Sequence, residues 1–211
     1  LIDWRVYART DEYFIKQYEA ERNLTVHVLL DTSASMDFGD GRANKFEFAA
    51  RVGLAFAYLA AAGHDSFRFS TLGSDVDRLD RSQSTRGELL RLLDSVNATD
   101  PDGRTDFVES LSSYARTIRS RSLVVVVSDF LEDPDAIEDG LAALGDTDVL
   151  LVHVVAPEER DPDVVGDTVF EDPETGSTQR AYFAGSTAES YRERLSAHVD
   201  EEIGRASCRE R

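Results

Sequence analysis

The sequence predicts an α/β protein whose doubly wound, mostly parallel sheet has helices on both faces. The first observation is the run LVVVV at 123–127, which is apolar on both faces and indicates a strand covered on both sides, as in a parallel sheet. The second is a similar run at 149–155. The third is that stretches with helical spacing of apolar residues separate the predicted strands, an alternation typical of a doubly wound sheet.

The N-terminal part supplies the first strands and the first helix. Residues 23–31 (NLTVHVLLD) are rich in β-branched and aliphatic residues and predict a buried strand that ends in an acidic residue. Residues 12–21 alternate enough to predict an extra, more exposed strand before it. Residues 44–62 have apolar residues at helical spacing. The contact face of this predicted helix is made of small residues, which would let it approach a sheet closely.

The rest of the chain continues this alternation. We expect the strand at 149–155 to be as buried as the one at 123–127, and the segment DPETG at 172–176 to turn a surface hairpin. The helix predicted over 84–96 has four inward-facing residues, Leu89, Leu92, Leu93 and Val96. The remaining predicted elements are strands over 66–72 and 76–79 joined by a hairpin turn, helices over 106–119, over 134–144 and from 186 onward, and hairpin strands over 168–170 and 179–183.

The length of 211 residues suits one large α/β domain. We divide the chain into an N-terminal segment, 1–22, the α/β domain proper, 23–202, and a C-terminal segment, 203–211. The last segment reads IGRASCRER and resembles the translation of a sequencing-adapter read-through, so we expect it to be an artefact and the domain to be truncated at its C-terminus. We expect the N-terminus to be cut as well.

The charge is strongly acidic, with 41 acidic side chains against 23 basic ones and a net charge of −18. Nothing in this composition would neutralise phosphate, which argues against a nucleic-acid partner. The longest apolar run, 54–62, is too short to span a bilayer. Only Lys16 and Lys45 are lysines, a scarcity that resembles the proteins of salt-adapted (haloarchaeal) cells. We expect a cytoplasmic protein, with membrane attachment through an upstream segment left open.

Three stretches of chain carry residues that could form a site. Asp31, Ser33 and Ser35 directly follow the first buried strand, Asp129 follows the strand at 123–127, and Thr105 lies in a loop that leads into a helix. Ligands of open α/β sheets gather beyond the carboxyl ends of the strands, where the strand order reverses. If the two strands are neighbours, both carboxylates face one crevice. Two carboxylates with three hydroxyls make an all-oxygen donor set, which suits Mg²⁺ or another hard divalent cation.

A known metal site has the same residues in the same order along the chain and at the same places in the fold. It is the metal-ion-dependent adhesion site (MIDAS) of von Willebrand factor A domains, which is resembled by Asp31-x-Ser33-x-Ser35, Thr105 and Asp129. The resemblance implies a von Willebrand factor A or Rossmann-like fold, with these five residues as metal ligands. Only two of the five ligands carry charge, so the ion would stay electron-poor and favour a carboxylate from another molecule.

Residues near the beginning of the chain indicate a particular family among the proteins that carry such domains. The segment from Ile2-Asp3-Trp4 to Arg9-Thr10, then Tyr18-x-x-Glu21 and the stretch 29–36, is similar to the domain-of-unknown-function 58 family. That family carries an A-type domain and is commonly encoded beside MoxR-type AAA+ ATPases. The resemblance implies a Mg²⁺-dependent protein-binding domain that clamps an acidic residue of a partner. It also implies work with such an ATPase in the assembly or maturation of a protein complex.

One enzymatic alternative stays open, a Mg²⁺-dependent aspartyl phosphotransferase or phosphatase, which also places an aspartate after the first strand. Against it, Ser33 stands where haloacid-dehalogenase-type enzymes need a second aspartate, and Lys45 is the one lysine that could serve the phosphoryl group. We therefore expect no enzymatic activity.

Overall fold

The computed structural model describes residues 24–39, 44–73, 76–78, 86–119, 121–162 and 164–207. The whole predicted N-terminal segment 1–22, including the strand predicted over 12–21, lies outside this range, as do residues 208–211. The helices and strands are β1 (Thr25–Asp31), η1 (Ala34–Met36), α2 (Lys45–Ala62), β2 (Ser66–Leu72), β3 (Val76–Arg78), α3 (Arg86–Asn97), α4 (Phe107–Ala115), β4 (Ser122–Ser128), α5 (Pro134–Ala142), β5 (Asp148–His153), α6 (Pro157–Arg160), β6 (Gly166–Glu171), β7 (Thr178–Phe183) and α7 (Ser186–Ser207).

The main sheet has five strands in the order β3-β2-β1-β4-β5. β1 pairs in parallel with β2 on one side and with β4 on the other, β4 pairs in parallel with β5, and only β3 is antiparallel. The chain therefore moves outward from β1 in both directions, and the strand order reverses between β1 and β4. This confirms the predicted α/β class with a mostly parallel sheet and makes β1 and β4 the neighbours that the predicted site requires.

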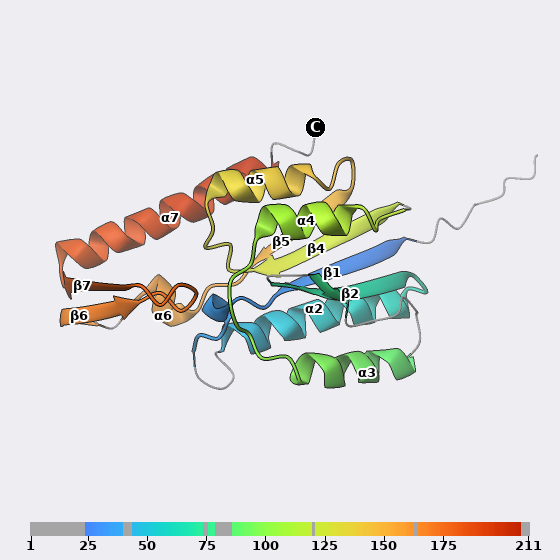
Figure 1. The fold of residues 1–211 in the computed structure, drawn as a ribbon, viewed down its shortest axis with the longest axis horizontal. Coiled ribbons are helices and arrows are strands. Elements are labelled where there is room, and N and C mark those ends of the chain that lie inside the picture. The colour runs from blue at the N-terminus through green and yellow to red at the C-terminus, as the bar shows by residue number, and fades with distance from the viewer. Residues whose placement is uncertain are drawn as a thin grey trace, which may run out of the picture.

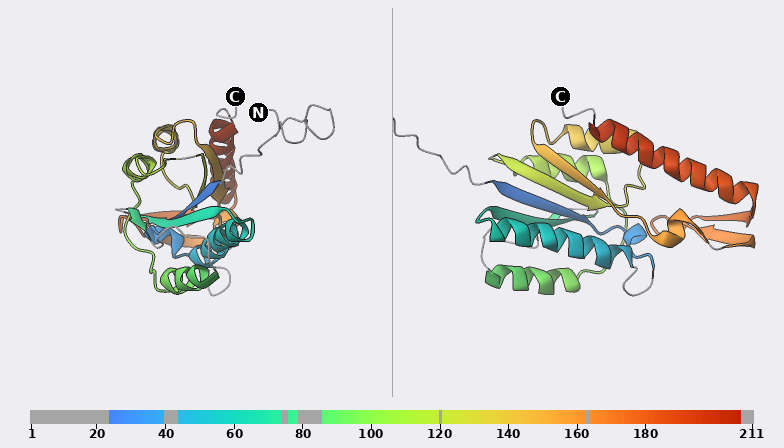
Figure 2. Two further views of the ribbon diagram at one scale, coloured as in Figure 1. Left: turned by 90° about the vertical axis from the view of Figure 1, so that its right-hand side faces the viewer. Right: turned by 180° about the vertical axis from the view of Figure 1, so that it is seen from behind.

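Helices cover both faces of the sheet (Figures 1 and 2). α2 lies against one face with α3 outside it, and α4 and α5 lie against the other face. The small contact face predicted for α2 is buried, and a Cβ added at Gly53 would come within 3.1 Å of side-chain atoms of Phe69 and Val28. Close approach of α2 to the sheet therefore depends on this glycine.

Two burial predictions are wrong. Leu93 was expected to face inward, but it is 41% exposed, because α3 packs on α2 and buries only a narrow stripe that includes Leu92 and Val96. The strand at 149–155 was expected to be as buried as the one at 123–127. It is β5, which ends at His153 and forms the edge of the sheet, so its side chains are only partly covered.

The hairpin of β6 and β7 forms a second, two-stranded antiparallel sheet. It extends past the carboxyl edge of the main sheet, and α7 runs back beside it toward α5 (Figure 1). Tyr191 on α7 donates a hydrogen bond of 2.7 Å from its hydroxyl to the carbonyl oxygen of Glu159, which ties α7 to α6. Among the helices that the structure describes, none is both long and apolar enough to cross a membrane.

The final helix runs through residues 203–207, the first part of the segment predicted to be an artefact. A helical conformation carries no information on the origin of a sequence, so the proposed division at residue 203 stays a prediction. The same holds for the boundary at residue 23.

Candidate metal site

The carboxylate of Asp31, at the end of β1, collects hydrogen bonds from three other segments. Its Oδ1 accepts from the backbone N–H of Ser33 at 2.9 Å and from Thr105 Oγ1 at 2.7 Å. Its Oδ2 accepts from Ser128 Oγ at 2.5 Å. Asp31 is only 2% exposed. It therefore fixes the relative positions of the loop after β1, the loop before α4 and the end of β4.

The hydroxyl groups of the site are oriented by these bonds. Thr105 directs its proton to Asp31, which leaves the lone pairs of Oγ1 for another partner. The Oγ atoms of Ser33 and Ser35 lie 3.0 Å apart and hydrogen-bond to each other. Hydroxyl oxygens whose protons are already donated within the protein are suited to face a cation.

The loop before α4 is tied to the loop after β1 by backbone bonds. Ala34 donates to the carbonyl of Gly103 at 2.9 Å, and Asp102 donates to the carbonyl of Thr32 at 2.9 Å. Gly103 has φ +71°, a conformation that favours glycine. Asp106 then caps α4 by accepting from the N–H of Glu109 at 2.9 Å. These contacts hold Thr105 at the point where the chain enters α4.

Asp129 follows β4 and is paired with a buried lysine. Nζ of Lys45 donates to Asp129 Oδ2 at 2.7 Å and to Glu159 Oε1 at 2.6 Å. Glu159 is fixed in turn by the backbone N–H of Ala156, at 2.9 Å from its Oε2. The other oxygen of Asp129, Oδ1, has only a long contact of 3.4 Å with the N–H of Leu131 and is the one left for a further partner.

The backbone after Asp129 is strained. Phe130 has φ +48°, an uncommon conformation for a bulky residue. Its ring is buried between Phe107 and His153, with ring centroids 5.6 and 5.8 Å away, and its N–H donates to Ser128 Oγ at 3.0 Å. Packing of this ring holds the turn, which aims Asp129 into the crevice. Strain of this kind is concentrated at functional sites.

Burial shapes the electrostatics of the site. Burial raises the pKa of Asp31, hydrogen bonds from Ser128, Ser33 and Thr105 oppose this, and the charge of Asp129 adds to it. Burial also raises the pKa of Glu174, and the charges of Asp129 and Asp31 raise this pKa further. An interaction with Ser35 lowers the pKa of Glu174 in part. Negative charge is thus concentrated here, and a bound cation would relieve the repulsion.

The structure brings together all five residues predicted from the sequence, and it adds others. The additional residues are Ser128, Lys45, Glu159, Glu132, Arg104 and Glu174. Ser128 could have been found from the sequence, since it is the last residue of the strand that Asp129 follows. The sequence indicates Lys45 only as a lysine that could contact a phosphoryl group, not as a partner of Asp129. Glu174 gave no signal, because it lies in a segment that reads as an exposed turn.

The donor set fits a hard divalent cation. Among the described residues, no three His, Cys, Asp or Glu side chains are grouped so that they could hold a metal ion, so hydroxyl groups would have to supply part of any coordination shell. The hydroxyls of Ser33, Ser35 and Thr105 and the oxygens of two carboxylates suit Mg²⁺. Around them, the carboxylates outnumber the two cations Lys45 and Arg104. The carboxylates are Asp31, Asp129, Glu132, Glu159 and Glu174.

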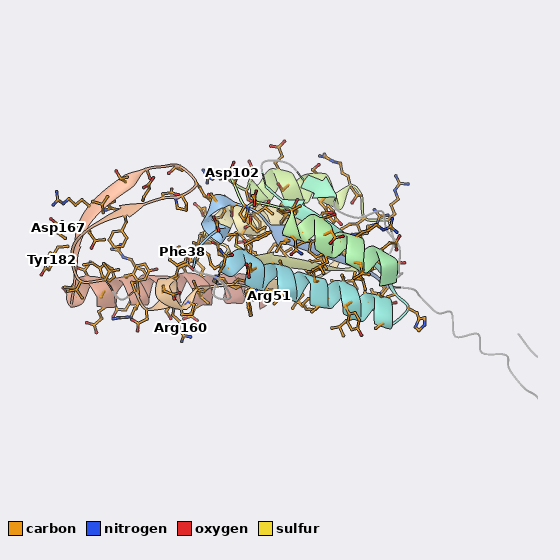
Figure 3. The ribbon with its side chains drawn as sticks, turned by 90° about the horizontal axis from the view of Figure 1, so that it is seen from below. Phe38, Arg51, Asp102, Arg160, Asp167 and Tyr182 are labelled. Atoms are coloured by element: carbon orange, nitrogen blue, oxygen red, sulfur yellow. The ribbon has the colours of Figure 1, made fainter. Side chains whose placement is uncertain are left out.

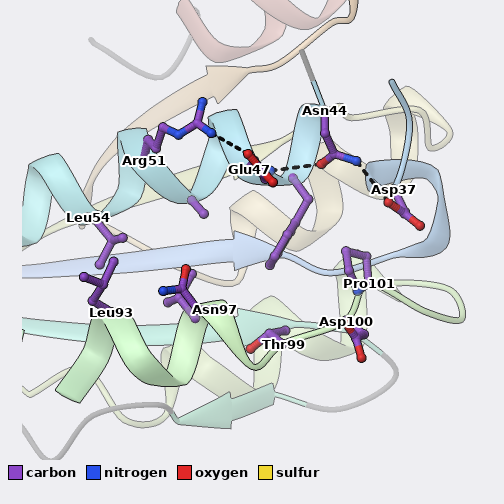
Figure 4. Close-up of a pocket in the computed structure, with 13 residues that line it drawn as sticks. Asp37, Asn44, Glu47, Arg51, Leu54, Leu93, Asn97, Thr99, Asp100 and Pro101 are labelled. Atoms are coloured by element: carbon purple, nitrogen blue, oxygen red, sulfur yellow. Dashed lines mark hydrogen bonds and ion pairs between the residues drawn. The ribbon is translucent and has the colours of Figure 1, made fainter. Parts of the chain in front are cut away.

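A separate cleft of about 430 Å³ lies between α2 and the end of α3 (Figure 4). Its polar side chains are largely paired with one another: Asn44 donates to Asp37 Oδ1 at 3.0 Å, and Arg51 pairs with Glu47. Leu93 forms part of its wall. None of the five predicted metal ligands lines this cleft.

Two uncharacterized proteins, from Mycobacterium bovis and Mycobacterium tuberculosis, are each 26% identical to the chain over 202 residues. The alignment covers 93% of the chain, and the chain spans 63% of the length of these relatives.

Among solved structures, an aerotolerance-related membrane protein from Bacteroides fragilis aligns with a TM-score of 0.52 at 16% identity, covering 82% of this chain and 88% of that one. A von Willebrand factor type A structure from Catenulispora acidiphila aligns with a TM-score of 0.45 at 13% identity, covering 82% and 42%. At these identities the likeness concerns the fold alone. The profile of a protein family, in contrast, matches residues 1–202, nearly the whole sequence. The chain therefore belongs to the protein family of unknown function DUF58.

Proposed function

We propose that this chain is a metal-dependent protein-binding domain that holds Mg²⁺, or another hard divalent cation, and uses it to bind a carboxylate of a partner protein. One observation carries the proposal. Asp31 accepts hydrogen bonds from the hydroxyl of Thr105 and the backbone N–H of Ser33, and the hydroxyl of Ser33 bonds to that of Ser35. This cluster lies where the strand order reverses, and the charge of Asp129 acts on Asp31 there. The proposed ligands are Asp31, Ser33, Ser35, Thr105 and Asp129.

The charge of this donor set explains why the site would bind rather than react. Both oxygens of Asp31 already accept hydrogen bonds, and one oxygen of Asp129 is bound to Lys45. The protein would therefore offer the ion few carboxylate oxygens that are not already hydrogen-bonded. A carboxylate from outside would fill an open coordination position on the ion, which is the chemistry the cation supplies.

The partner is a protein with an exposed acidic residue, and we propose that a MoxR-type AAA+ ATPase is this partner or works with it in the assembly or maturation of a protein complex. The support is the family resemblance of the sequence. A cytoplasmic location would agree with such a partner.

We propose a binding domain in preference to an aspartyl phosphotransferase. Lys45 does lie at the same crevice, as that alternative requires, but it is engaged by Asp129 and Glu159. Asp31 would be the nucleophile, yet Ser33 stands where enzymes of the haloacid-dehalogenase type place the second aspartate that serves as acid and base. Release of phosphate from small phosphoesters, lost in the variant Asp31→Asn, would support the enzyme instead.

Calorimetric titration with Mg²⁺ tests the metal site. We expect Thr105→Val and Asp31→Ala to lose Mg²⁺ binding. The matched control is Thr117→Val, which removes a buried hydroxyl without a hydrogen-bond partner among the described residues and should bind as the parent does. Far-UV circular dichroism checks that each variant is folded. Binding that is unchanged in Thr105→Val would contradict the proposed ligand set.

A capture experiment tests the partner. A purified MoxR-type ATPase should be retained on the immobilised chain with Mg²⁺ and released by EDTA, and Asp31→Ala should not retain it. If the ATPase stays bound in the presence of EDTA, its binding does not depend on the metal, even if the chain itself binds Mg²⁺.

A further inference from the structure

The tip of the β6–β7 hairpin comes back to the candidate metal site. The strands extend away from the main sheet, with Asp167 and Tyr182 far from the sheet, while the turn between them returns toward its carboxyl edge (Figures 1 and 3). Glu174 lies in this turn, and its Oε2 is 3.8 Å from Nε of Arg104, the residue before the proposed ligand Thr105. Burial raises the pKa of Glu174, and an interaction with Ser35, another proposed ligand, opposes this. The side chain is only 20% exposed, although its neighbours in the turn are exposed.

The turn is built so that Glu174 points inward. Asp172 Oδ1 accepts from the N–H of Glu174 at 2.9 Å and from the N–H of Thr175 at 3.4 Å, and its Oδ2 accepts from Thr175 Oγ1 at 2.6 Å. The backbone closes with Gly176 N–H to Asp172 C=O and Asp172 N–H to Ser177 C=O, both at 2.8 Å. A turn with this many internal bonds is a defined structure and positions its side chains.

Glu174 also lies near the loop before α4. Arg104, the residue before Thr105, forms a two-point contact with Glu132 at 3.1 and 3.4 Å, and its Nε lies 3.8 Å from Glu174 Oε2. Ser35 belongs to the loop after β1 and Arg104 to the loop before α4. The carboxylate of Glu174 therefore lies between the two loops that supply the hydroxyl groups.

This position is electrostatically unfavourable without a cation. The negative charges of Asp129, Asp31 and Glu132 raise the pKa of Glu174, and Arg104 is exposed to solvent and already paired. An exposed ion pair of this kind contributes at most about 1 kcal/mol. The ion pair with Arg104 is therefore too weak to explain why the hairpin places the carboxylate of Glu174 beside three other carboxylates.

We propose that Glu174 is a built-in carboxylate occupant of the metal site, so that the hairpin closes the crevice and the acidic group of a partner binds by displacing it. This inference rests on the proposed function, because the occupant mimics the group that the partner would supply. A tethered carboxylate competes at an effective concentration in the millimolar range, so a partner needs contacts beyond its acidic residue to open the site. The hairpin thus regulates access.

The test uses the 211-residue chain, Mn²⁺ as the metal and acetate as the external carboxylate. Bound Mn²⁺ relaxes the methyl protons of acetate only when acetate reaches the ion. The variant is Glu174→Gln, and the matched control is Glu171→Gln, which makes the same change on an exposed residue of the same hairpin. We expect all three proteins to bind Mn²⁺. At equal Mn²⁺ occupancy, Glu174→Gln should bind acetate about tenfold more tightly than the other two, as for a closed state populated at roughly 90%.

A second measurement follows the hairpin itself. Hydrogen exchange of the amides of Thr175, Gly176 and Ser177 should slow on addition of Mg²⁺ in the parent chain and in Glu171→Gln, but not in Glu174→Gln. The two readouts together report both the access of acetate and the closure of the turn.

Three other results would overturn all or part of this proposal. Equal acetate relaxation in all three proteins, with Mn²⁺ bound, overturns the regulatory role of Glu174 and leaves the metal site intact. Loss of Mn²⁺ binding in Glu174→Gln alone makes Glu174 a required ligand and overturns its displacement by a partner. Absence of Mn²⁺ binding in every protein overturns this inference and the proposed function together.

Discussion

The ammonium group of Lys45 lies 2.7 Å from Asp129 Oδ2 and 2.6 Å from Glu159 Oε1, and Lys45 is only 1% exposed. Lys45→Met should destabilise the chain by about 3 kcal/mol, because it leaves two carboxylates near the core without their cation. Urea unfolding without divalent ions measures this change. Mg²⁺ should restore more stability to Lys45→Met than to the parent chain, since binding to the native state stabilises it and the crevice of the variant is more negative.

The control for this variant is Arg51→Met. Arg51 pairs with Glu47 one helical turn earlier on α2, and both side chains are about half exposed. The loss should be about 0.3–0.5 kcal/mol, as for solvent-exposed pairs on helices. Similar losses for Lys45→Met and Arg51→Met would show that Lys45 does not hold the site together.

Ser128 supports the site without being a proposed ligand. Its hydroxyl donates to Asp31 Oδ2 at 2.5 Å and accepts from the N–H of Phe130 at 3.0 Å. Ser128→Ala leaves both groups without this partner and should cost about 2 kcal/mol of unfolding free energy. Ser70→Ala removes a buried hydroxyl for which the described part of the chain offers no hydrogen-bond partner, and it should change stability little. Thermal unfolding of the two variants compares them directly, and equal melting temperatures would contradict the role assigned to Ser128.

The packing of α4 against α5 depends on Gly140. A Cβ at this position would lie 2.9 Å from the carbonyl oxygen of Phe107. Gly140→Ala should therefore destabilise the fold by about 1–3 kcal/mol through overpacking. Gly87 on α3 has open space around it, so Gly87→Ala should stabilise the chain by up to about 1 kcal/mol. Chemical denaturation measures both changes, and a stabilising Gly140→Ala would show that the two helices can separate without cost.

The fold was predictable because its signals are local. The run at 123–127 and the small face of the helix over 44–62 specify β4 and α2 by pattern alone. The errors at Leu93 and in β5 arise from position: α3 packs on a helix rather than on the sheet, and β5 is an edge strand. Periodicity identifies an apolar face, but it does not report how completely another element covers that face.

The five proposed ligands were predictable because they follow strands whose ends meet at one edge of a parallel sheet. Lys45 and Glu174 were not predicted at the site in this way. Lys45 reaches Asp129 from the first turn of a helix, and Glu174 reaches Arg104, beside Thr105, through the path of a hairpin. Such contacts depend on how α2 and the β6–β7 hairpin are oriented relative to the sheet, and a short sequence motif does not specify that orientation.

Asp172 provides an independent test of the hairpin, because it contacts the turn and none of the proposed ligands. Its carboxylate organises the turn through the N–H groups of Glu174 and Thr175 and the hydroxyl of Thr175. Asp172→Ala should loosen the turn while Glu174 remains chemically intact. We expect Mn²⁺ affinity as in the parent chain and acetate relaxation raised toward that of Glu174→Gln. Asp167→Ala, which breaks an exposed pair with Arg180 at the far end of the hairpin, is the control. If Asp172→Ala and Asp167→Ala both match the parent, the turn does not need its internal bonds to place Glu174. A rise in both would instead assign the effect to general loosening of the hairpin.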